Sequence, residues 1–180
     1  MANELAQLVL ENGEDAVKEK SDALDDLKIK LKENIEVGRV VRFEAAAGNV
    51  LDAYLHMPSG PPSLNGVLVE LQGGTKEQAH AVALHISFAR PSVLNRDEFA
   101  ADEVEKEREA ILAETKTEGK PEQAWPKIVE GRLGGWFKRI PGGALQDQEY
   151  QHPDADGKQS VQHALGDAKL VRFAQVEVGG

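Results

Sequence analysis

Residues Gly119–Lys138 read GKPEQAWPKIVEGRLGGWFK and are the strongest guide to the architecture of this 180-residue chain. Gly119-Lys120-Pro121 predicts a reversal of the chain, because glycine is common just after a helix end and proline cannot continue a helix. A helix then returns, and Pro126 restarts or kinks it because proline has no backbone N–H. The apolar side chains of this returning helix fall near one face: Trp125, Ile128, Val129, Leu133, Trp136 and Phe137.

The segment before the reversal, Asp97–Glu118, is strongly polar and carries only a thin apolar stripe. A narrow apolar seam is typical of two helices that pack on each other rather than of a central core helix. Residues 97–138 are therefore expected to form a projecting, coiled-coil-like helical hairpin, inserted in a core made of residues 35–96 and 139–180. The hairpin is either a secondary partner surface or an appendage that only stabilises the protein.

Residues 1–34 form an expected N-terminal helical segment. Asn3 is predicted to cap a first short helix, and Asn12-Gly13 to end it, because both residue types tolerate the left-handed conformation. In Glu14–Glu33 the apolar positions fall on one face while Lys, Asp and Glu fill the others, which predicts a second helix.

Three β-rich stretches follow, separated by turn signals: Ile35–Glu44, Val50–His56 and Leu64–Leu71. The last two are separated by the loop Pro58–Pro62, whose prolines remove backbone donors. Lys169–Val178 is predicted to be a strand that returns to the sheet. Neighbouring strands with short connections indicate an antiparallel sheet.

One helix is expected to pack on this sheet. Thr75 and Gln78 match a capping box at its start, and Pro91 ends it. A second, brief helix is predicted at Gln159–Leu165. The sequence therefore predicts an α+β fold, in which helices pack on an antiparallel β-sheet and a helical hairpin projects from it.

The composition excludes several classes of function. The formal net charge is −10, and no run of Lys and Arg could neutralise successive phosphates, so direct binding of nucleic acid is not expected. The absence of cysteine excludes disulfides and thiolate nucleophiles. No stretch approaches about 18 consecutive apolar residues. The N-terminus has no signal-peptide pattern, so a cytoplasmic protein without membrane association is expected.

Motifs for nucleotide binding and for catalysis are missing from the sequence. It has no GxGxxG, no glycine-rich loop ending in Gly-Lys-Ser or Gly-Lys-Thr, no GxSxG and no HExxH. No catalytic residue, no cofactor and no enzymatic activity are therefore expected.

Histidines and acidic residues give no metal-site pattern either. His80 and His85 are separated by roughly 140° around a helix, so they are not expected to share a metal ion, and His80 is expected to pack or hydrogen-bond near the sheet. Asp154–Gly157 is interpreted as a turn rather than a calcium loop, because Leu165 stands where a bidentate glutamate is required.

Several further stretches matter for their order along the chain. They are Lys30–Arg39 (KLKENIEVGR), Val50–His56 (VLDAYLH), Gly66–Glu70 (GVLVE), His80–Pro91 (HAVALHISFARP) and Val171–Gly179 (VRFAQVEVG). Together with Gly119–Lys138 they resemble the later half of bacterial translation elongation factor Ts, the guanine-nucleotide exchange factor of elongation factor Tu. The resemblance implies that this chain binds elongation factor Tu and promotes exchange of GDP for GTP during protein synthesis.

Two elements on which that family's exchange chemistry depends do not occur in this sequence: an N-terminal helical module and a Thr-Asp-Phe-Val element. The chain is therefore interpreted as the later core of an elongation factor Ts, either a fragment or a divergent short form. One alternative is a binding module without exchange activity. Another is a self-associating domain that forms a homodimer, since the family's core halves can pair with each other.

The resemblance implies three places of contact with elongation factor Tu. The first is Leu31-Lys32, where the family commonly has Ile-Gly. The lysine replaces a small residue that allows close approach of the backbone, and the alternative is that Leu31 is simply buried against the sheet. The second is His56, which matches a histidine that ends a strand and faces the partner. The alternative is an ordinary surface histidine.

The third place is Tyr150-Gln151-His152, at the position of the family's Pro-Phe-Val segment. Glu149 stands at the proline position, so the match is weaker there.

Overall fold

The structure, a computed structural model, describes residues 1–57, 64–152 and 158–179. The expected loop Pro58–Pro62 and the expected turn Asp154–Gly157 lie outside these residues. The chain forms two compact units. The first contains residues 1–44 and the C-terminal residues from Val178, and the second is Ala45–Glu177.

The first unit is helical. Helix α1 spans Ala2–Asn12, a 3-10 helix spans Glu14–Lys20, and helix α2 spans Ser21–Leu31. Gly13 follows α1 with a φ of 91°, which confirms the predicted break. The second predicted helix is therefore divided into a 3-10 part and an α part.

Two details of the first unit differ from the expectations. Asn3 lies inside α1 and does not cap it, because Met1 is the N-cap residue and its carbonyl accepts the N–H of Leu5. The stretch Ile35–Glu44 contains no strand, so that prediction was wrong. Arg42 shows why: its N–H donates to the Glu14 carboxylate at 2.7 Å and its Nε donates to the Leu10 carbonyl at 3.1 Å, so helical residues supply its partners.

The second unit is built on a three-stranded antiparallel sheet, as predicted. Strands β1 (Asn49–His56), β2 (Asn65–Gln72) and β3 (Lys169–Glu177) lie in the order β1-β2-β3. Side chains alternate between the two faces of each strand, and β2 buries every second apolar residue on one face. These buried side chains are Val67, Val69 and Leu71.

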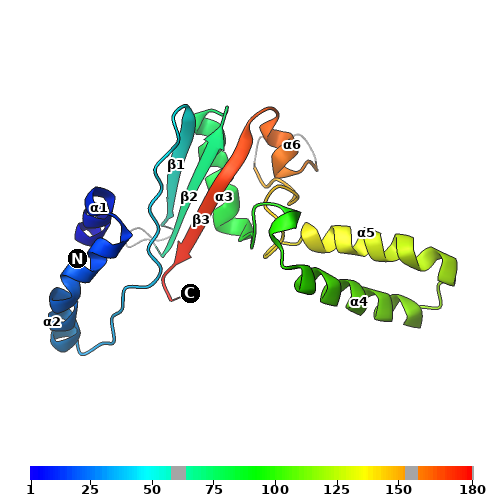
Figure 1. Cartoon of the computed structure of the whole chain (residues 1–180), viewed down its shortest axis with the longest axis horizontal. Helices are drawn as coiled ribbons and strands as arrows, with labels where there is room; N and C mark the ends of the chain where they lie inside the picture. The colour runs from blue at the N-terminus through cyan, green and yellow to red at the C-terminus, as the bar shows by residue number, and fades with distance from the viewer. Residues whose placement is uncertain (58–63, 153–157, 180) are drawn as a thin grey trace. The chain divides into compact units, whose positions relative to one another are not determined.

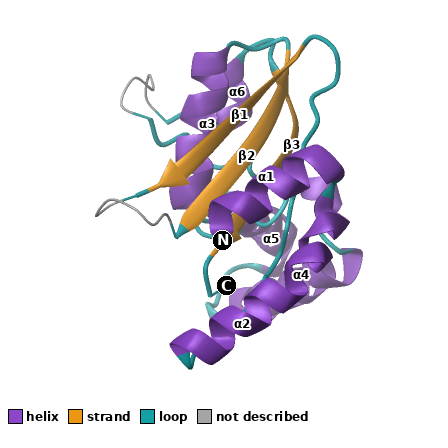
Figure 2. Cartoon of the chain, turned by 90° about the vertical axis from the view of Figure 1, so that its left-hand side faces the viewer, coloured by secondary structure: helices purple, strands orange, loops and turns teal. Residues whose placement is uncertain are grey.

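Helix α3, Lys76–Ala89, covers that face of the sheet (Figures 1 and 2). Thr75 and Gln78 form the predicted capping box, with reciprocal side-chain to backbone bonds at 3.2 and 3.0 Å. The short helix α6, Val161–Leu165, joins the same core and lies within the predicted range. The core of this layer combines buried residues of the sheet, both helices and the adjoining loops: Val67, Val69, Leu71, Ala79, Val82, Ala83, Ile86, Leu145, Val161, Leu165, Ala168 and Leu170.

The helical hairpin consists of α4 (Ala101–Thr117) and α5 (Trp125–Phe137), which follow a short 3-10 helix at Arg96–Glu98 and are joined through another at Glu122–Ala124. It extends away from the sheet (Figure 1). Pro126 lies in the first turn of α5, where the missing N–H needs no partner, so it does not kink the helix. The apolar seam contains Phe99, Ile111, Val129, Leu133, Phe137 and Ala144.

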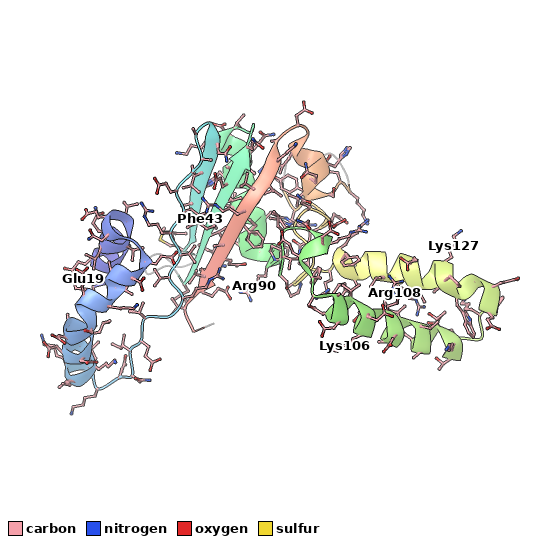
Figure 3. The ribbon with its side chains drawn as sticks, viewed as in Figure 1. Glu19, Phe43, Arg90, Lys106, Arg108 and Lys127 are labelled. Carbon is pink, nitrogen blue, oxygen red and sulfur yellow. The ribbon has the colours of Figure 1, made fainter. Side chains whose placement is uncertain are left out.

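Ion pairs flank this seam. The Arg108 side chain pairs with Glu130 across the hairpin, and Arg132 pairs with Glu114 and Glu118 at 3.2 and 2.6 Å. Figure 3 shows Arg108 between the two arms. These groups are exposed or partly exposed, so each pair contributes little, and the apolar seam supplies most of the association.

The base of the hairpin is tied to the end of α3 by backbone hydrogen bonds. The N–H of Gly142 donates to the carbonyl of Arg90 at 2.9 Å, and the N–H of Ser92 donates to that of Gly143 at 3.0 Å. Within the base, the N–H of Ala144 donates to the carbonyl of Phe137 at 2.8 Å. Gly143 lies so close to this backbone that a Cβ there would be 2.5 Å from the carbonyl oxygens of Phe137 and Arg139. Glycine is therefore required where the hairpin returns to the core.

Candidate partner-binding surface

Leu31 and Lys32 lie at the end of α2, in the first unit. The Leu31 side chain is 53% exposed, so its interpretation as a buried sheet contact was wrong. Lys32 caps the helix in the left-handed conformation, with φ 57° and ψ 35°, and its N–H donates to the Lys28 carbonyl at 2.8 Å. Glycine adopts this conformation without strain, which gives a physical reason for a small residue at this position.

His56 is the last residue of β1 and is exposed. The hydroxyl of Tyr54 lies 3.0 Å from Nδ1 of His56, and the two rings are 6.0 Å apart. Since alternate residues of a strand share a face, Asp52, Tyr54 and His56 form one row along the α3 side of β1. Three polar or aromatic groups therefore follow one another toward the end of the strand.

His80 joins this row from helix α3. Its Nδ1 lies 2.8 Å from Oδ2 of Asp52, and its ring meets Tyr54 edge-on at 5.8 Å. The Asp52 side chain is only 10% exposed, so solvent supplies few hydrogen bonds to its carboxylate. The hydrogen bond from His80 gives this largely buried carboxylate a partner. The predicted hydrogen bond of His80 near the sheet is confirmed.

The segment Tyr150–His152 is irregular. The N–H of Tyr150 donates to the carbonyl of Gln159 at 2.8 Å, which attaches the segment to the residues just before α6. The rings of Tyr150 and His152 stack, 5.6 Å apart and within 8° of parallel. Gln151, between them, is exposed.

A buried histidine of helix α3 binds the backbone of this segment. His85 of α3 is 1% exposed, and its Nδ1 lies 3.2 Å from the backbone N–H of Gln151. An N–H can only donate, so Nδ1 accepts and the proton of the neutral ring sits on Nε2, which donates to Gln148 Oε1 at 3.1 Å. Burial lowers the pKa of His85, which favours this neutral form.

The side-chain amide of Gln148 completes the network. Its Nε2 donates to the carbonyls of Ala89 and Arg139 at 3.3 and 3.0 Å. These bonds fix the amide orientation, so that Oε1 faces His85. The end of α3, the base of the hairpin and the segment at Gln151 are thus connected through two buried side chains.

A pocket of about 340 Å³ joins the two sets of residues. Its lining includes Asp52 from β1, His80 from α3 and His152 from the irregular segment. The structure therefore brings His152 near Asp52 and His80, at the end of the row that lies four positions along β1 from His56. Leu31 and Lys32 belong to the first unit and are not described relative to this pocket.

Sequence reasoning missed two residues of this surface, Asp52 and Tyr54, and two buried residues that support it, His85 and Gln148. The place of Asp52 and Tyr54 could have been inferred from the sequence, because alternate residues of a strand share a face and both alternate with His56. The place of His85 and Gln148 could not, because they are distant in sequence and meet only in the folded chain. Among residues 1–57, 64–152 and 158–179, no three acidic or histidine side chains gather as metal ligands. None of the helices described there is both long and apolar enough to span a membrane.

The sheet, the packed helix α3 and the inserted hairpin make this chain an α+β protein with a projecting helical hairpin. The family model described as elongation factor TS matches residues 1–180. The chain belongs to the elongation factor Ts family, which is a family of translation elongation factors.

Three relatives illustrate the extent of the similarity. The chain is 42% identical over 153 residues to elongation factor Ts of Clavibacter michiganensis subsp. michiganensis, covering 83% of this chain and 52% of the relative. It is 41% identical over 162 residues to that of Acidothermus cellulolyticus, with 88% and 55% covered, and 41% identical over 160 residues to that of Streptomyces coelicolor, with 87% and 54% covered. The chain spans about half the length of the curated relatives it matches.

Proposed function

We propose that this chain binds elongation factor Tu and promotes exchange of GDP for GTP during protein synthesis in the cytoplasm. Family membership over the whole chain is the observation that carries the proposal. The contact surface would consist of Leu31 and Lys32 in the first unit, and of His56 with Tyr150–His152 in the second. The exposed position of His56, held by Tyr54 at the end of β1, supports its part in this surface.

The proposed mechanism is differential binding rather than bond breaking. A protein that binds the nucleotide-free conformation of its partner more tightly than the nucleotide-bound one speeds nucleotide release, by linkage. The sequence has no glycine-rich phosphate-binding loop, which agrees with a protein that acts on the nucleotide site of another. This role is not that of an enzyme.

The test is the release of a fluorescent GDP analogue from elongation factor Tu, with and without this chain, beside a pull-down in the same buffer. Faster release that is lost in His56→Ala would support the proposal. His163→Ala is the matched control, because His163 is exposed on α6 and lies outside the pocket lining. No binding at micromolar concentration would refute the proposal.

A second candidate function is binding without exchange, as a docking or self-associating module. The residues of this chain include no Thr-Asp-Phe-Val element, on which the resemblance makes exchange depend. Capture of elongation factor Tu with an unchanged rate of GDP release would indicate the docking module. Light scattering across a range of protein concentrations distinguishes the self-associating module from the docking module. If the chain forms a homodimer, the average molar mass rises with concentration.

A further inference from the structure

We infer that Tyr54 is a positioning residue for His56: its hydroxyl donates to Nδ1 of His56 and thereby places the ring proton on Nε2. The inference rests on the proposed function of His56 as a contact with elongation factor Tu. It assigns Tyr54, together with Asp52 and His80, a part in that surface.

The first support is the row along β1. Asp52, Tyr54 and His56 occupy alternate positions and so project from the same face of the strand. Tyr54 OH and His56 Nδ1 are 3.0 Å apart, a distance that is normal for a hydrogen bond. Side chains two apart on a strand do not need to bond, so this contact adds a constraint that the backbone alone does not impose.

The second support is the set of contacts that holds the ring of Tyr54. An ionised carboxylate can only accept, so Nδ1 of His80 carries the proton that it shares with Asp52 over 2.8 Å. That bond fixes the ring of His80, whose edge-on contact at 5.8 Å then limits the ring of Tyr54. Tyr54 also packs against the buried core formed by the sheet and α3. Its hydroxyl is consequently held in place beside His56.

The chemistry of the two groups decides the direction of the bond. A phenol O–H is a good donor, while the unprotonated nitrogen of a neutral imidazole is a good acceptor. When Tyr54 donates to Nδ1, the proton of neutral His56 must reside on Nε2. The residue then has one fixed tautomer and one fixed ring orientation before it meets a partner, which lowers the entropic cost of binding.

The test uses Tyr54→Phe, which keeps the ring and removes only the hydroxyl. Nitrogen-15 chemical shifts of the imidazole of His56, measured at about pH 8 in the free chain, report which ring nitrogen is protonated. We expect a protonated Nε2 and an unprotonated Nδ1 in the wild type, and a mixture of tautomers in Tyr54→Phe. A protonated Nδ1 in the wild type would overturn the inference without any mutation.

The binding arm is a double-mutant cycle with elongation factor Tu. Tyr54→Phe removes one orienting hydrogen bond, so its affinity for elongation factor Tu should be about 5-fold lower than that of the wild type. In a His56→Ala background the same substitution should change affinity by less than about 2-fold, because the residue it positions is gone. An equal loss in both backgrounds would show that Tyr54 acts only through the fold, and would overturn the inference.

The two arms separate this inference from the proposed function. If the wild-type chain does not bind elongation factor Tu, the proposed function fails, while the tautomer measurement in the free chain still decides whether Tyr54 positions His56. Thermal melting of Tyr54→Phe, monitored by circular dichroism, should match the wild type within a few degrees. A large loss of stability would assign Tyr54 a structural role and count against the inference.

Discussion

Nδ1 of His85, on the buried side of helix α3, accepts the backbone N–H of Gln151 at 3.2 Å, across 66 positions of sequence. Together with the packing of Tyr150 against the core, this bond attaches the segment Tyr150–His152 to helix α3. It requires that Nδ1 is unprotonated, so the bond exists only in the neutral form of His85. The candidate contact segment is therefore linked to the protonation state of a histidine that is itself buried.

The first prediction concerns pH and stability. Burial lowers the pKa of His85 below its ordinary value of 6.5, so the unfolded chain takes up a proton at a higher pH than the folded chain does. The contribution of neutral His85 is fully present above about pH 6.5, and is lost as pH falls from there through the lowered folded pKa. Urea unfolding between pH 8 and pH 5 measures this loss.

The slope that His85 adds is at most about 1.4 kcal/mol per pH unit, which corresponds to one proton. His85→Gln should reduce the slope of the free energy of unfolding against pH, whatever its effect on absolute stability. His163→Gln is the control, because His163 is exposed and should leave the slope unchanged. Equal slopes for His85→Gln and the wild type would contradict the role given to burial.

The second prediction concerns a buried carboxylate on the sheet. Glu70 is 1% exposed, and it accepts from Asn49 Nδ2 at 2.7 Å, from the N–H of Ala46 at 3.0 Å and from Arg172 Nε at 2.6 Å. These hydrogen bonds, from Asn49 first, hold its pKa below the ordinary value of 4.5. Glu70→Ala should lower the free energy of unfolding by about 1–3 kcal/mol, because buried donors lose their acceptor.

The stability that the Glu70 carboxylate contributes also depends on pH, in the same direction as for His85. Its contribution is present above about pH 4.5 and is lost as pH falls through its lowered folded pKa. Acid unfolding of Glu70→Gln should therefore begin from a lower stability but fall less steeply than that of the wild type. Exposed Glu109 offers the matched control in Glu109→Gln, for which a comparable flattening would argue against a special role of Glu70.

The third prediction uses two glycines with opposite surroundings. A Cβ on Gly143 would lie 2.5 Å from two backbone carbonyl oxygens, whereas a Cβ on Gly131 of α5 would meet nothing within 4 Å. Gly143→Ala should lower the free energy of unfolding by about 1–3 kcal/mol, through forced backbone shifts. Gly131→Ala should raise it by about 0.5–1 kcal/mol, because alanine favours a helix. Denaturant unfolding compares the two, and similar effects of both would contradict the close approach at Gly143.

The sequence was sufficient to predict what local rules govern. Val50–His56 and Leu64–Leu71 alternate and lie beside turns, and both form strands within one residue of the predicted limits. The Thr75–Gln78 cap and the reversal at Gly119 follow from side-chain chemistry and glycine conformation. Ile35–Glu44 has an equally extended pattern but forms no strand, because a strand also needs a neighbour with which to pair.

The candidate surface likewise contains features that local sequence patterns predict and features that they do not. The position of His56 at a strand end and the hydrogen bond of His80 near the sheet could be predicted, since each depends on one element and its neighbour. The pairing of His85 with Gln148 could not, because it spans 63 positions and no periodicity connects the two residues. Such contacts are set by the packing of α3 against the hairpin base rather than by any local propensity.

The last prediction concerns the end of α2. Lys32 holds a φ of 57°, a conformation that costs a residue with a Cβ roughly 1 kcal/mol more than glycine. Lys32→Gly should therefore raise the stability of the helical unit by about 0.5–1 kcal/mol, even though glycine also loses more entropy on folding. Lys30→Gly, two positions earlier and inside α2, should lower it by about the same amount because glycine is a poor helix former. Helicity measured by circular dichroism during thermal unfolding distinguishes the pair, and a lower helicity in both variants would contradict the strain assigned to Lys32.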